Sequence, residues 1–169
     1  MIRAGTLLLV SLSLAGSLAG CNLQPMFPGG GSGEVARGLA RIEVAPIPGK
    51  SGWLMRNALN DRLAAAGDGS GNARYRLDVR LDDSLEGLGL INDDTIGRER
   101  RTLRARYQLV DLTTDAIVLD ASTSSDAGID VVSSEYATIA AEQTALENLT
   151  QVVADSILSR VALALRNQK

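Results

Sequence analysis

Two segments of this chain alternate strictly between apolar and polar residues, and this alternation constrains the fold more than any other feature. From Arg74 to Asp82 the residues at every second position are Tyr75, Leu77, Val79 and Leu81. From Arg98 to Val110 the inner positions are Leu103, Ala105, Tyr107 and Leu109. A period of two predicts a β-strand with one face in a hydrophobic core and the other in solvent. The two segments are therefore expected to pair as neighbouring antiparallel strands.

Two further strands are expected beside them. Residues 41–45 alternate in the same way, and Pro46 and Pro48 end this strand. Residues 116–123 form the last strand, with Ile117, Leu119 and Ala121 facing inward. Residues 84–94 contain two glycines and two adjacent aspartates, and they are expected to be a long hairpin connection, while residues 126–130 are expected to be a loop.

Two segments have the period of an amphipathic helix. In residues 51–66 the apolar stripe is Leu54, Met55, Ala58, Leu59, Leu63 and Ala66, and Trp53 is expected to pack against the sheet. A longer helix is expected to start at Ser133 or Ser134, either of which can cap it, and to run to about Arg166. Its stripe consists of Leu146, Leu149, Val153, Ile157, Val161 and Leu165.

The fold class that buries all these stripes is α+β. We expect a two-layer sandwich in which two helices pack on one face of a four-stranded mixed sheet, in the order β-α-β-β-β-α. The other sheet face is then open. The chain has 169 residues, and we divide it into a signal peptide over 1–20, a lipidated N-terminus with a Gly/Pro-rich tether over 21–38, and a single α+β domain over 39–169.

The open sheet face carries a row of arginines, which we call the arginine row: Arg98, Arg100, Arg104 and Arg106. Guanidinium groups donate two parallel hydrogen bonds to phosphates and carboxylates, so the row suits an anionic ligand. The alternative is pairing with Asp78 and Asp82 on the preceding strand, which would neutralise the surface. The sequence leaves both alternatives open.

The N-terminus predicts a lipid anchor. A basic start and an apolar segment over residues 6–18 are typical of a secretory signal peptide, and Leu18-Ala19-Gly20-Cys21 is similar to the lipobox that the bacterial lipoprotein signal peptidase cleaves. Cys21 would then be the first residue of the mature protein and carry acyl chains. Asn22 stands where an aspartate commonly retains lipoproteins at the inner membrane, so release to the outer membrane is expected.

The residues that the chain lacks argue against catalysis. There is no histidine, Cys21 is the one cysteine, and Lys50 and Lys169 are the two lysines, so His-based and thiol catalysis, His/Cys zinc sites and disulfides are excluded. A net charge of −3 argues against nucleic acid as a partner. The acidic residues around Asp82, Asp83, Glu86, Asp93 and Asp94 do not have the spacing of a calcium loop, and we expect no metal and no cofactor.

Three short stretches carry a resemblance to a known family. They are Leu18-Ala19-Gly20-Cys21 with Asn22-Leu23-Gln24-Pro25-Met26-Phe27, then Trp53-Leu54-Met55-Arg56-Asn57-Ala58-Leu59, and Tyr107-Gln108-Leu109-Val110-Asp111. Together they resemble the LptE family of lipopolysaccharide-assembly lipoproteins in its alphaproteobacterial form. The resemblance implies a non-enzymatic lipoprotein on the periplasmic side of the outer membrane. It would plug the β-barrel of the lipopolysaccharide translocon, assist its assembly and contact lipopolysaccharide.

Two other functions remain as alternatives. One is an auxiliary lipoprotein of a phospholipid or ABC-type transport system, whose partner would lie on the inner-membrane side. The other is a periplasmic hydrolase that uses carboxylates, for which the sequence offers no positive sign. Because lipopolysaccharide is anionic, the arginine row is the candidate surface for contacting it.

Overall fold

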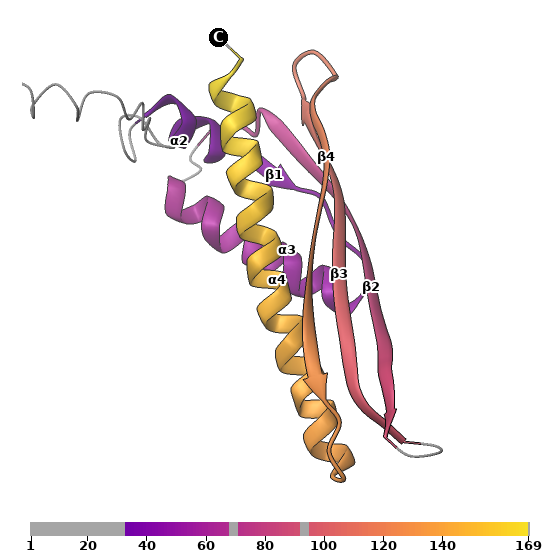
Figure 1. Ribbon diagram of the computed structural model, residues 1–169. Helices are drawn as coiled ribbons and strands as arrows, with labels where there is room; N and C mark the ends of the chain where they lie inside the picture. The colour runs from indigo at the N-terminus through magenta and orange to yellow at the C-terminus, as the bar shows by residue number, and fades with distance from the viewer. Residues whose placement is uncertain (1–32, 68–70, 92–94, 169) are drawn as a thin grey trace, which may run out of the picture.

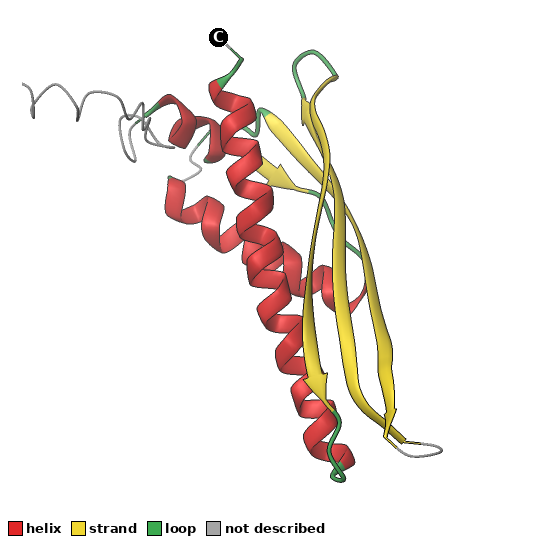
Figure 2. Cartoon of the chain, in the orientation of Figure 1, coloured by secondary structure: helices red, strands yellow, loops and turns green. Residues whose placement is uncertain are grey.

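The computed structural model describes residues 33–67, 71–91 and 95–168. Its elements are α2 (Glu34–Leu39), β1 (Ile42–Val44), α3 (Gly49–Ala66), β2 (Tyr75–Ile91), β3 (Thr95–Asp111), β4 (Ala116–Asp130) and α4 (Glu135–Arg166). The strand order is β1-β2-β3-β4, with β1 parallel to β2 and the other neighbours antiparallel. The helices lie on one side of this sheet (Figures 1 and 2). The expected α+β sandwich with a mixed four-stranded sheet is confirmed.

The core lies between the inner face of the sheet and the stripes of α3 and α4. Leu77, Leu103 and Leu109 of the sheet have no exposed surface, and neither do Leu59 of α3 and Ile157 of α4. Each such side chain stabilises the fold by roughly 1.5–3 kcal/mol relative to an exposed position. The alternation that predicted β2 and β3 therefore identifies the inner face correctly.

The sequence pattern missed helix α2. Val35, Ala36 and Leu39 are buried, and α2 packs against α3 and α4 beside the C-terminal end of α4 (Figure 1). Residues 34–38 were expected to belong to an extended tether, and the structure differs there. A helix of six residues completes fewer than two turns, which is too short for a helical period to show in the sequence.

The two central strands are longer than expected. β2 runs to Ile91 and β3 starts at Thr95, so the prediction of a long connection over 84–94 is wrong. The loop expected over 126–130 is also wrong, because β4 continues to Asp130. Past Leu81 the inner-face positions become mixed, with Asp83 and Leu85 on β2 and Arg101 on β3, and the alternation that marks a half-buried strand is lost.

Two side chains do not lie where the pattern placed them. Ile117 was expected to face inward and is 58% exposed, because a register shift at Leu109 and Val110 changes the face of the β4 residues beyond it. Trp53 was expected to pack against the sheet and is 65% exposed on α3. Both departures leave an apolar side chain in solvent.

Helix α4 runs along the length of the sheet (Figure 1). As expected, Ser134 caps it, and the Ser134 hydroxyl accepts a hydrogen bond from the N–H of Ala137 at 3.4 Å. Its 32 residues correspond to about 48 Å at 1.5 Å per residue. None of the helices in the described ranges is both long enough and apolar enough to cross a membrane.

Candidate anion-binding face

The arginine row lies on β3, on the sheet face that no helix covers (Figure 2). Its four side chains alternate with the buried Leu103, Ala105 and Tyr107, so the β-strand period places all of them on the outer face. All four residues are exposed. The structure therefore brings the four predicted arginines together on one surface.

The acidic partners of the row lie on β4. Three of the arginines form exposed ion pairs, which are Arg98–Asp130 at 3.0 Å, Arg100–Asp126 at 3.8 Å and Arg106–Asp120 at 3.2 Å. The alternative of pairing with β2 is not what the structure shows, because Asp78 binds Arg76 of its own strand. Exposed pairs of this kind are worth at most about 1 kcal/mol, so an anionic ligand can displace the carboxylates at little cost.

Asp120 is the most strongly held of these carboxylates. Gln108 donates a hydrogen bond to it at 2.8 Å and Arg106 donates another at 3.2 Å. The hydrogen bonds from Gln108 and Arg106 lower the pKa of Asp120 below its usual value. These hydrogen bonds favour the ionised form of Asp120, which accepts from both Gln108 and Arg106.

Arg104 differs from the other three arginines. It forms no ion pair or hydrogen bond within the described ranges, and its cross-strand neighbours are Asp82 on β2 and Ser124 on β4. Nearby, Arg80 of β2 lies directly opposite Arg106 of β3. Two like charges in opposing positions destabilise a sheet unless an anion lies between them. This part of the face thus has positive charge that the described chain does not fully compensate.

Arg80 is a residue of this face that the sequence pattern alone does not reveal as part of the site. Alternation with Val79 and Leu81 suffices to place Arg80 on the outer face, but its partner on β3 depends on the register of the β2–β3 hairpin. The hairpin turn was expected to be much longer than it is, so that register could not be read from the sequence. A short turn around residue 93 would have predicted the pair of Arg80 and Arg106.

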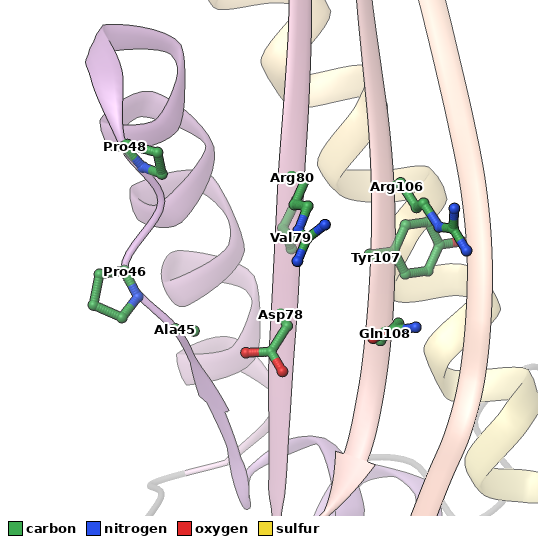
Figure 3. A pocket seen from close by; sticks show the side chains of 9 residues that line it. All are labelled: Ala45, Pro46, Pro48, Asp78, Val79, Arg80, Arg106, Tyr107 and Gln108. Atoms are coloured by element: carbon green, nitrogen blue, oxygen red, sulfur yellow. The ribbon is translucent and has the colours of Figure 1, made fainter.

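A cavity of about 690 Å³ opens beside these arginines, where the chain after β1 diverges from β2 (Figure 3). One wall is formed by Ala45, Pro46 and Pro48, and the other by residues of β2 and β3, namely Asp78, Val79, Arg80, Arg106, Tyr107 and Gln108. Arg80 and Gln108 supply hydrogen-bond donors to this side of the sheet. The cavity can therefore accept an anionic or hydrogen-bonding group next to the arginine row.

A second charged contact lies on the inner face and was also missed. Arg101 donates two hydrogen bonds of 2.8 Å to the carboxylate of Asp83 and one of 3.0 Å to the carbonyl oxygen of Glu142 on α4. The two side chains are 17% and 20% exposed. This contact joins β2, β3 and α4, and it is positioned to hold the helix on the sheet rather than to bind a ligand.

The described residues offer no group that could hold a metal. Among the residues of 33–67, 71–91 and 95–168, no three His, Cys, Asp or Glu side chains are arranged as metal ligands. The chemistry available on the outer face is hydrogen bonding and charge pairing by guanidinium groups. Cys21, the predicted lipidation site, and the signal peptide lie outside the described residues.

Comparison with solved structures finds the same fold in bacterial lipoproteins. A protein of Caulobacter crescentus CB15 assigned to the lipoproteins is 28% identical, with a TM-score of 0.63 over 80% of this chain and 97% of that one. Lipoprotein B of Nitrosomonas europaea is 12% identical, with a TM-score of 0.59 over 75% of this chain and 84% of that one. A minor lipoprotein of Acinetobacter baumannii is 13% identical, with a TM-score of 0.55 over 73% and 92%.

Comparison with families gives a specific result. No curated protein matches the chain significantly. The sequence model of the LptE family, described as lipopolysaccharide-assembly, matches residues 39–161. This range begins at the end of α2 and includes β1, α3, the three long strands and most of α4. The chain therefore belongs to the LptE family of lipopolysaccharide-assembly proteins.

Proposed function

We propose that this chain is a non-enzymatic, lipid-anchored subunit that assembles with the β-barrel of the lipopolysaccharide translocon and plugs it. It would be held at the periplasmic side of the outer membrane by acyl chains on Cys21. Membership of the LptE family over residues 39–161 is the observation that supports this role most strongly. The lipobox around Cys21 supports the anchor.

The proposal includes direct contact between the arginine row and lipopolysaccharide. Arg104 supports it best, because this exposed guanidinium has no ion pair within the described part of the chain. Arg80 and Arg106 face each other beside it, and a phosphate placed between them would relieve their repulsion. The exposed pairs of Arg98, Arg100 and Arg106 with β4 are weak enough to be exchanged for a ligand.

Co-purification from mild detergent tests the role in the translocon. The intact protein is expected to bring down one outer-membrane β-barrel protein in stoichiometric amount. A Cys21→Ser variant should shift from the membrane to the soluble fraction, since the acyl chains are then absent. Recovery of an inner-membrane transporter component with no barrel would contradict the proposal and support the ABC-type alternative.

A matched pair of charge reversals tests the lipopolysaccharide contact. Arg104→Glu is expected to weaken lipopolysaccharide binding roughly ten- to a hundredfold, because a hydrogen bond to a charged group is worth roughly 1.5–3 kcal/mol. Arg100→Glu combined with Arg104→Glu should weaken it further, with an unchanged far-UV spectrum. Arg56→Glu on α3 is the control, since Arg56 is exposed, has the same charge and lies in the helical layer. Equal affinities for Arg104→Glu and Arg56→Glu would show that the row is only a solvated surface.

A further inference from the structure

β2 has an open edge from Val79 to Leu85. β1 pairs with β2 only from Tyr75 to Leu77, and the last contact of this kind is a hydrogen bond of 3.1 Å from the N–H of Ala45 to the carbonyl oxygen of Leu77. Pro46 follows immediately and has no N–H to donate. Beyond this point no described residue supplies a backbone partner on that side of β2.

The direction of the backbone groups along this edge follows from the pairing. In a β-strand the N–H and C=O of one residue point to the same side, and those of the next residue point to the opposite side. Since Leu77 faces β1, the backbone groups of Val79, Leu81, Asp83 and Leu85 also face away from β3. The open edge therefore presents a row of unpaired donors and acceptors, which is a template for another strand.

The other edge of the sheet is better protected. Helix α4 packs along β4, and Arg160 of α4 donates a hydrogen bond of 3.1 Å to the outward carbonyl oxygen of Ser122. The described part of β2 has no such cap, no proline and no register shift. Natural sheets usually blunt an exposed edge with one of these devices. On β2 the protecting device is charge, from Asp82 and Glu86 outside and Asp83 inside, so the edge stays open to a strand that can pair with these charges.

We propose that the open edge of β2 accepts an extended basic segment of a partner protein as an additional strand. The side chains define the chemistry of this segment. Asp82 and Glu86 lie on the outer face of β2, whereas Val79, Leu81 and Leu85 lie on the inner face. Asp83 on the inner face is already neutralised by Arg101. A matching strand has basic residues outward and aliphatic residues inward.

The charge pattern of the sheet supports a basic occupant. On the outer face β4 contributes Asp120, Asp126 and Asp130, β3 contributes the arginine row, and β2 contributes Asp82 and Glu86 along the open edge, with Arg80 at the end of the edge nearest β1. A strand whose basic residues lie beside Asp82 and Glu86 continues this alternation of sign. The cavity between Pro46, Pro48 and Val79 gives the end of such a segment room to leave the sheet where β1 ends (Figure 3). The open edge shares with the arginine row only the cavity that Arg106 also lines, and its test does not depend on lipopolysaccharide binding.

A designed peptide tests the proposal on the intact protein in mild detergent. The probe is a nine-residue peptide that alternates lysine and valine, with fluorescence anisotropy for affinity and amide hydrogen exchange for location. It is expected to bind and to slow exchange at Val79, Leu81 and Asp83. A glutamate–valine peptide, and a lysine–valine peptide methylated on the amides that pair with β2, should each bind at least tenfold more weakly.

Two variants of the protein complete the test. Leu85→Pro removes an N–H that points to the open edge without breaking a hydrogen bond to β3. It should weaken binding of the lysine–valine peptide at least tenfold. Asp82→Lys with Glu86→Lys should reverse the preference between the two peptides, which keeps the proposal testable if the proline variant does not fold. Unchanged binding of the methylated peptide would overturn the proposal, as would protection on β4. Pairing of two copies through β2 in place of peptide binding would also overturn it.

Discussion

Replacing Arg101 with alanine measures how firmly the N-terminal part of α4 is held on the sheet near Asp83 and Arg101. The change removes two hydrogen bonds to Asp83 and one to the carbonyl oxygen of Glu142. An exposed ion pair is worth at most about 1 kcal/mol, and breaking a fully buried pair costs about 3–5 kcal/mol. Since the two side chains are 17% and 20% exposed, we expect a loss of about 2.5 kcal/mol in the free energy of unfolding.

Urea and thermal unfolding provide the assay, and the expected fall in melting temperature is roughly 10 °C. Arg98→Ala is a matched control, because Arg98 lies on the same strand and pairs with Asp130 at 3.0 Å, but these side chains are 63% and 74% exposed. It should cost no more than about 0.5 kcal/mol. Equal losses for Arg101→Ala and Arg98→Ala would refute the reasoning that burial gives the Arg101 contact its strength. The double variant with Asp83→Ala should show coupling between the two side chains.

Three further outcomes follow from the core, from one helix and from pH. Ile157→Ala should lower the free energy of unfolding by about 3 kcal/mol in urea titration, because Ile157 is fully buried; a loss below about 1 kcal/mol would contradict the described core. Gly52→Ala should destabilise by about 2 kcal/mol, although alanine usually favours a helix, because its Cβ would lie 2.5 Å from the carbonyl oxygen of Ile47; stabilisation in thermal melts would refute this contact. The hydrogen bond from Arg62 lowers the pKa of Asp155, so its contribution is present above the unfolded-state pKa and is lost as pH falls through the folded-state pKa. Unfolding at pH 7, 4 and 3 should therefore show a smaller acid-induced loss of stability for Asp155→Asn than for the wild type, by at most about 1 kcal/mol because the Asp155 side chain is 65% exposed, and identical profiles would contradict it.

The half of the sheet that α3 and α4 both cover could be predicted from the sequence, because only one face of each strand is buried there. Where α3 and α4 both cover the sheet, residues such as Leu77 and Leu109 must be apolar, and the period of two is clear. Farther along, the inner positions hold Asp83 and Arg101, which satisfy each other. The pattern disappears although the strands continue. The absence of alternation predicts a loop, and only the paired structure shows that these residues form strands.

The candidate site was predicted in its residues but not in its partners. The period of two suffices to place Arg98, Arg100, Arg104 and Arg106 on one face, and the structure agrees. Which charged residue of β2 lies opposite which arginine of β3 depends on the register of the hairpin, and this register depends on where the turn lies. For this reason the opposition of Arg80 to Arg106 emerges only from the structure.

The inner face of the sheet changes from apolar to polar along its length, and this change determines which part of the domain can unfold locally. Near α3 a local opening must expose side chains such as Leu59 and Leu103, which have no exposed surface. Near the start of α4, nine of the first ten residues, 135–144, are exposed or half-buried around the buried Thr138, and the polar contact of Arg101 replaces aliphatic packing. Segments with little buried apolar surface open at a lower free energy than the global unfolding of the domain. We therefore expect that the N-terminal part of α4 can rearrange against a partner while the part of the domain around α3 stays folded.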